Sequence, residues 1–278
     1  MATLTVYAGA GDGFVRSGGN SSWDTTHHLT NGGSAFPTVS AENVNASLSG
    51  SNYNIDRLFF PFDTSSLPDD ATIDSATFSF YITAHGGTNT LGIVQTSQAD
   101  TTTLVTEDYD QCGSIHSATE GATRLNLASL TDAAYNVFTL NATGLGFISK
   151  TGTTKLGMRF GYDLDDSAAT DSSAGLSINF SESTGTSTDP KLVISYTLAT
   201  TTSTTTSSST SSTSTTTTQS ITTSTTTTTS TTRSTSTSTT TTSSSTSTTS
   251  TSTSTTSTST TSTSSTTTMP FSIAVDSP

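Results

Sequence analysis

Basic residues are scarce in this sequence. Lys and Arg number 8 against 21 Asp and Glu, so the net charge is −13 at pH 7. The part after residue 199 contributes only Arg233 and Asp276, which cancel, so residues 1–199 carry the whole excess. A nucleic-acid-binding protein needs a basic surface to neutralise phosphates, so nucleic acid is not an expected partner.

Cysteine and long apolar runs are also rare. Cys112 is the one cysteine, so no disulfide can form within the chain and packing must hold the fold. No apolar run approaches the ~18 residues of a membrane helix, so no membrane span is expected. The opening residues have neither a basic region nor an apolar stretch of signal-peptide length, so no signal peptide is predicted.

Ser and Thr dominate the C-terminal third of the chain. Between residues 200 and 268 the exceptions are Gln219, Ile221 and Arg233. A stretch of this composition cannot bury a core, and it is typical of a disordered spacer or an O-glycosylated stalk.

The composition therefore predicts three parts. Residues 1–198 are expected to form one globular domain, and residues 199–268 a Ser/Thr-rich low-complexity linker. Residues 269–278 regain apolar character, which fits a docking peptide or the truncated start of a further module.

Apolar residues alternate with polar ones through most of the first part. In residues 74–83, for example, Phe78, Phe80 and Ile82 share one face, while Ser79 and Tyr81 share the other. Strict alternation with one polar face is typical of antiparallel sheets. The sequence therefore predicts an all-β fold, an antiparallel, jelly-roll-like β-sandwich followed by a disordered Ser/Thr-rich tail. Its strands are expected at 3–8, 13–16, 56–62, 74–83, 91–96, 135–140, 155–162, 176–181 and 191–197.

Two long connections, residues 17–54 and 98–121, separate these strands. Both are polar and Gly-rich, and long loops of a compact domain often carry function. The aromatic residues on them are the candidate ligand-binding residues, because an exposed ring can stack on a sugar. They are Trp23, Tyr53 and Tyr109. The alternative is that these rings fold back onto the sandwich.

Acidic residues gather directly after the strand expected at 155–162. Asp163, Asp165 and Asp166 are the candidate metal ligands, because oxygen-rich clusters of this kind can hold Ca²⁺. The alternative is a solvated acidic turn without a cofactor, which is the preferred interpretation. His27 and His28 would point to opposite faces of an extended segment, so they are not expected to share an ion.

Motifs of catalysis are missing from the sequence. It contains no Gly-x-Ser-x-Gly elbow, no His-Glu-x-x-His and no phosphate-binding loop. The carboxylates are too scattered to nominate an acid and base pair for glycoside hydrolysis. We therefore expect a protein that is not an enzyme, with a glycan-active enzyme as a remote alternative.

The segment DRLFFPFDTSSLPDDATIDSATFSFYI, residues 56–82, resembles the central signature of disaggregatase-related, or DNRLRE-type, β-sandwich modules. Residues 105–127, 138–163 and 185–197 are similar to domains of tailed-phage structural proteins and environmental bacterial surface proteins. Several such modules are classed with carbohydrate-binding modules. The resemblance thus implies a sandwich fold and carbohydrate binding, and it assigns no binding residue.

These observations predict a non-enzymatic accessory protein on a virion or extracellular surface. A β-sandwich head on a Ser/Thr-rich tether would bind carbohydrate or a host cell-surface glycan, beside virion or surface-layer proteins. The alternative is a purely structural decoration domain of a phage particle or surface layer that binds no sugar.

Overall fold

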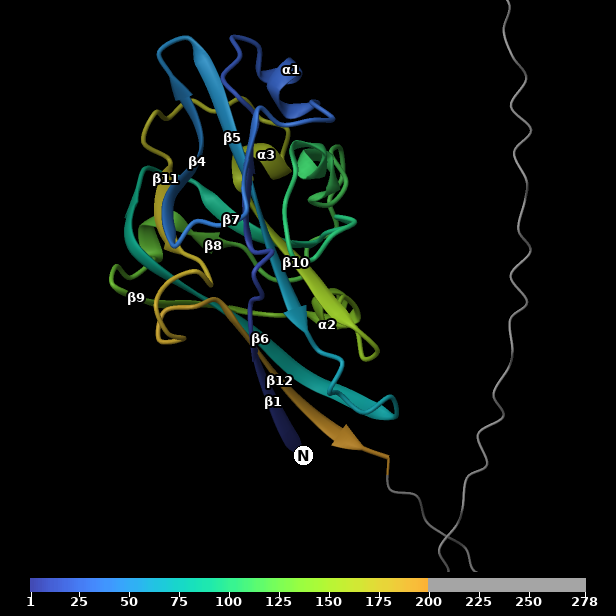
Figure 1. The fold of residues 1–278 in the computed structure, drawn as a ribbon. Helices are drawn as coiled ribbons and strands as arrows, with labels where there is room; N and C mark the ends of the chain where they lie inside the picture. The colour runs from blue at the N-terminus through green and yellow to red at the C-terminus, as the bar shows by residue number, and fades with distance from the viewer. Residues whose placement is uncertain (200–278) are drawn as a thin grey trace, which may run out of the picture. The chain divides into compact units, whose positions relative to one another are not determined.

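The computed structural model describes residues 1–199 of the protein (Figure 1). Nearly the whole predicted linker and the predicted segment 269–278 therefore lie outside the described residues. The described part is mainly antiparallel β-structure with a few short helices, as the alternating sequence predicted. No helix in residues 1–199 is long and apolar enough to span a membrane.

The first layer of the fold has β6 at its centre. β12 and β9 pair with opposite edges of β6, β1 extends the layer beyond β12, and β11 joins β6 to β4. The strands of this layer are β1 (Ala2–Tyr7), β4 (Ala41–Ser49), β6 (Ala71–Gly86), β9 (Ala134–Thr139), β11 (Gly175–Asn179) and β12 (Lys191–Leu198). Because β1 pairs with β12, the start of the chain lies beside the last strand (Figure 1).

The second layer is built around β5 and β10. β10 lies between β5 and β7, while β2 joins β5 to β3. Its strands are β2 (Gly13–Arg16), β3 (Ser34–Phe36), β5 (Asn52–Asp63), β7 (Thr90–Gln95), β8 (Leu125–Asn126) and β10 (Thr153–Phe160). The β4–β5 hairpin links the two layers.

The main core lies between the layers and is rich in phenylalanine. Phe60 of β5 and Phe78 of β6 have ring centroids 4.9 Å apart, and Phe78 stacks on Phe138 of β9 at 6.3 Å. Phe78, Phe80 and Ile82 are fully buried, which confirms the face assigned to them by alternation. Burial of such rings is the principal driving force for a fold without disulfides.

A second apolar cluster lies against the outer face of the second layer. Segments 17–33, 98–121 and 161–170, which we call the cover, pack on this face (Figure 1). The cluster contains Val15, Trp23, Ile55, Phe59, Val94, Leu104, Tyr109, Cys112 and Ala169. The predicted long loops thus act partly as packing elements, and they explain why β5 is buried on both faces.

The short helices lie mainly in the cover, where the sequence predicted loop or strand. They are α1 (Trp23–His27), η1 (Thr106–Gln111) and α3 (Gly161–Leu164), while η2 (Leu127–Ser129) and α2 (Ala142–Gly146) lie elsewhere. The side chain of Asn141 caps α2 by accepting from the Gly144 amide at 2.9 Å. The expected loop 17–54 also contains β3 and β4. β3 has only 3 residues, too few to show a period, and polar side chains weaken the apolar pattern of β4.

Candidate functional site

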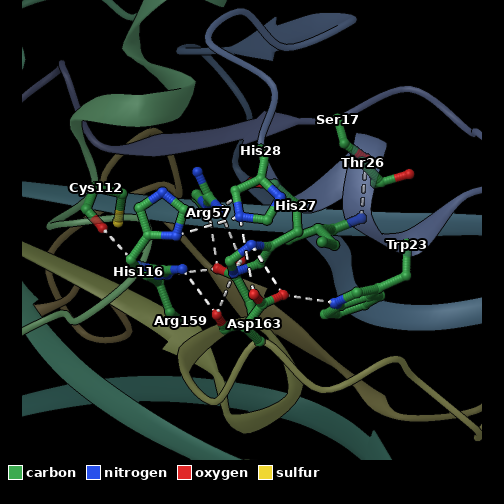
Figure 2. Close-up of polar contacts among 12 residues, drawn as sticks. Ser17, Trp23, Thr26, His27, His28, Arg57, Cys112, His116, Arg159 and Asp163 are labelled. Carbon is green, nitrogen blue, oxygen red and sulfur yellow. Dashed lines mark hydrogen bonds and ion pairs between the residues drawn. The ribbon is translucent and has the colours of Figure 1, made fainter.

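A buried ion-pair cluster of Arg57, Asp163 and Arg159 lies where the cover meets the second layer (Figure 2). Arg57 donates to both Asp163 carboxylate oxygens, at 2.7 and 3.0 Å, and Arg159 donates to Asp163 as well. Burial would raise the pKa of Asp163, but Arg159 and Arg57 hold it well below its usual range. Asp163 is therefore a structural counter-ion, ionised at neutral pH.

Tyr109 belongs to the surroundings of this cluster. The Arg57 guanidinium lies 4.1 Å from the centroid of the Tyr109 ring, and the Tyr109 hydroxyl donates to the Thr26 carbonyl at 3.0 Å. Tyr109 is fully buried, so its ring has no free face for a sugar in this structure.

Trp23 and Tyr53, the other two predicted loop aromatics, contact each other edge to face with centroids 5.5 Å apart. Trp23 is the first residue of α1 and is only 8% exposed, because its ring stacks on His27. Its indole nitrogen donates to Asp166 Oδ1 at 3.0 Å. Tyr53 is half-buried, so of the three predicted ligand-binding residues it keeps the most accessible ring.

The carboxylates of the three candidate calcium ligands point to three different partners. Asp163 pairs with the buried arginines, Asp165 pairs with Arg124 at 2.7 Å, and Asp166 accepts from Trp23. The cause is α3: the strand expected at 155–162 ends at Phe160, and the helical turn that follows separates the three side chains.

His27 and His28 also differ from their expected placement. Residues 23–27 are helical, so the two rings do not point to opposite faces of a strand, and their centroids lie 4.7 Å apart. Within the described residues, the group of His and acidic side chains close enough to share a metal ion is His27, His28 and Asp166.

An exposed aromatic surface occurs instead on the outer face of the first layer. Strand pairing places Tyr7, Lys191, Ser79 and Val137 in one row across β1, β12, β6 and β9. In the neighbouring row, Tyr81 faces Tyr135 with ring centroids 5.5 Å apart. We call this surface the tyrosine face, with the members Tyr7, Ser79, Tyr81, Tyr135, Val137 and Lys191.

The tyrosine face combines one exposed ring, that of Tyr7, with the half-buried rings of Tyr81 and Tyr135 and with fixed polar groups. Tyr7 is 40% exposed and Val137 is 45% exposed, whereas the small side chain of Ser79 lies beneath its neighbours. The Lys191 ammonium lies 4.1 Å from the centroid of the Tyr135 ring, whose hydroxyl donates to the Asp189 carbonyl at 2.9 Å. Such a surface offers stacking area and hydrogen-bonding groups together.

A polar groove of about 270 Å³ lies beside the first layer. Amide, hydroxyl and imidazole side chains of Asn43, Asn45, His85, Ser172, Ser173 and Ser177 line it. Its one aromatic ring is the His85 imidazole, so the groove offers a ligand mainly hydrogen bonds and little stacking area.

The sequence did not predict the tyrosine face, because the candidate binding residues were sought on the long loops and not on the strands. Alternation already placed Tyr81 opposite the core, which was the available signal. Tyr7 and Tyr135 lie in other strands, and only the strand register brings them to the same face as Tyr81.

Comparison with known proteins gives a distant structural likeness. No family model and no curated protein matches this chain. A similar solved structure is described as "Structural basis for the promiscuous specificity of the carbohydrate-binding modules from the beta-sandwich super family". The alignment has a TM-score of 0.26 and 9% identity, and it covers 68% of this chain and 57% of that chain. The chain therefore has a β-sandwich carbohydrate-binding module as a weak structural neighbour, and this likeness carries no argument about a ligand.

Proposed function

We propose that the β-sandwich is a non-catalytic domain that binds carbohydrate on the tyrosine face. The supporting observation is that Tyr7, Tyr81 and Tyr135, from three different strands, lie on one outer surface. Tyrosine suits this role because its ring covers apolar sugar faces while its hydroxyl bonds to sugar hydroxyl groups.

The expected ligand is an extended, uncharged glycan. The face extends across four paired strands, which fits several sugar units better than a single one. The net charge of −13 would repel an acidic polysaccharide. Tyr81 and the groove residue Ala84 are three residues apart on β6, and the register shift between them turns both outward, so roughly 10 Å of strand would connect the stacking surface to the polar groove.

We also propose that the domain is displayed on a virion or extracellular surface. The resemblance to DNRLRE-type modules and phage structural domains supports display on a virion or extracellular surface, with the Ser/Thr-rich tract as the tether. The rival function, a decoration domain without sugar binding, is favoured by the exposed apolar side chain of Val137 within the face. In that case the tyrosine face would contact a neighbouring protein.

A glycan array probed with the full chain tests the proposal. We expect binding to neutral glycans, and we expect Tyr7→Ala and Tyr81→Ala each to weaken it about three- to tenfold. Tyr53→Ala is the matched control, because Tyr53 is a half-buried tyrosine on the cover. If Tyr7→Ala and Tyr81→Ala bind glycan like the wild type while Tyr53→Ala binds it more weakly, the binding site lies at the loop aromatic residues and not on the tyrosine face. An array without any bound glycan would favour the decoration domain.

A further inference from the structure

Three histidines and one aspartate meet at the surface of the cover, and the proposed sugar binding uses none of them. His27 and His28 come from α1, His116 from the segment after η1, and Asp166 from the end of α3 (Figure 2 shows the histidines). We call this group the histidine cluster. His28 Nε2 lies 3.3 Å from His116 Nδ1, and His27 Nδ1 lies 3.2 Å from Asp166 Oδ1.

The hydrogen bonds around His27 and His28 determine which ring nitrogens are free. His27 Nε2 lies 2.8 Å from the Asp163 carbonyl oxygen, and His28 Nδ1 lies 2.8 Å from the Asp24 carbonyl oxygen. A carbonyl can only accept, so each of these nitrogens must carry the proton. The lone pairs therefore lie on His27 Nδ1 and His28 Nε2, the nitrogens that face Asp166 and His116.

The second ring nitrogen of His27, Nδ1, lies in an unfavourable environment. His27 is fully buried, and its Nδ1 has no hydrogen-bond partner although the Asp166 carboxylate is close. A buried lone pair beside a carboxylate is unfavourable, because two acceptors face each other without a proton or a cation between them. A cation bound between His27 Nδ1 and the Asp166 carboxylate would remove this conflict.

We propose that His27 Nδ1, His28 Nε2 and the Asp166 carboxylate, which lie within 4.8 Å of one another, bind one divalent transition-metal ion, with Zn²⁺ as the expected metal. His116 Nδ1 lies 3.3 Å from His28 Nε2, and a small movement of this exposed side chain would supply the fourth ligand. Zinc prefers four tetrahedral ligands at about 2.0–2.1 Å, which places neighbouring ligand atoms about 3.3 Å apart. The separations of 3.2 Å between His27 Nδ1 and Asp166 Oδ1 and of 3.3 Å between His28 Nε2 and His116 Nδ1 agree with this spacing. His28 Nε2 and Asp166 Oδ2 are 3.8 Å apart, so they would move closer together around the ion. Imidazole nitrogen favours zinc over Ca²⁺ or Mg²⁺, which bind oxygen.

The outer contacts are also those of a metal site. Metal-binding histidines commonly donate their other ring N–H to a carbonyl or carboxylate, as His27 and His28 do here. Trp23 orients Asp166 by donating to its Oδ1. The ion would connect α1, the loop at His116 and the end of α3, and so fasten the cover onto the second layer.

Zinc titration of the full chain, purified without a polyhistidine tag and stripped with chelator, tests this proposal. Calorimetry should give one Zn²⁺ per chain, and Co²⁺ should give the intense visible absorption of four-coordinate cobalt. His28→Gln and His116→Gln should each weaken zinc binding by more than about tenfold. Bound zinc should also raise the Tm of the wild-type chain.

His85→Gln is the matched control, because the chain has 4 histidines and His85 pairs with Asp132 outside the cluster. This variant should bind zinc like the wild type. His28 is partly exposed and His116 is exposed, so their substitutions should preserve the fold, which the Tm of the metal-free variants will check. If either variant unfolds, Asp166→Asn replaces it, because Asn tolerates the positive φ of 47° at this position. Equal zinc affinity in the wild type and the cluster variants, or no binding by the wild type, would overturn the proposal.

Discussion

Arg57 and Asp163 are 106 residues apart in sequence and form a two-bonded ion pair that is fully buried. Asp163→Asn would leave Arg57 and Arg159 buried without their counter-ion, so we expect unfolding free energy to fall by about 3–5 kcal/mol. Asp165→Asn breaks only the exposed pair with Arg124 and should cost under about 1 kcal/mol. Denaturant unfolding measures both, and equal losses would contradict the structural role of Asp163.

The Trp23 side chain is expected to stabilise the fold, because it packs against His27 and Tyr53. Trp23→Ala should lower the unfolding free energy by about 3 kcal/mol, the lower end for a buried aromatic residue. Trp23→Phe keeps the ring and loses the hydrogen bond to Asp166, so it should cost only about 1 kcal/mol. A Tm unchanged in Trp23→Ala would show that this side chain is free on the surface.

Substitutions of Phe78 and Phe80 test which face of β6 is turned toward the core. Both are fully buried between the layers, so replacing either with Ala should cost about 3–5 kcal/mol. Thr77 points away from this core, and Thr77→Ala should cost well under about 1 kcal/mol. Equal losses from the two faces of β6, measured by thermal unfolding, would refute the register.

Because Asp12 is buried, we expect the free energy of unfolding to fall as the pH rises. Burial raises the pKa of Asp12 from 3.8 to about 8, and neighbouring Glu182 adds to this although Ser181 opposes it. Between these two pH values the folded protein binds the proton more tightly than the unfolded chain, so raising the pH weakens folding. Asp12→Asn removes this loss, so its Tm relative to wild type should rise between pH 4 and pH 8.

The expected gain for Asp12→Asn is at least about 1 kcal/mol at pH 8 relative to pH 4, or roughly 2–4 °C in Tm. Asp70→Asn, at an exposed aspartate, is the control substitution and is measured at the same pH values. A Tm difference for Asp12→Asn that stays constant with pH would mean that Asp12 is ionised in the folded state.

The domain boundary at residue 198 remains a prediction that truncation can test. β12 ends at Leu198, so cutting the chain after this residue should preserve one cooperative melting transition. Cutting before Lys191 removes β12, which lies between β1 and β6, and should abolish the transition. Loss of cooperativity in the longer fragment, residues 1–198, would mean that later residues complete the core.

The sequence by itself determined the class of the fold and the inward faces of most strands. Alternation identifies Phe78 and Phe80 as core residues, because a strand turns successive side chains to opposite faces whatever its partners are. It also separated the first 198 residues from the Ser/Thr-rich tract. It missed β4, AENVNASLS, because polar side chains weaken its apolar pattern.

Only the tertiary structure decided which residues meet. Asp163, Asp165 and Asp166 are neighbours in sequence, yet a helical turn and distant partners send them to different places. Conversely, His28 and His116, 88 residues apart, come within 3.3 Å because both belong to the cover. The tyrosine face likewise depends on strand register, which arises from pairing between distant segments and leaves no local signal in the chain.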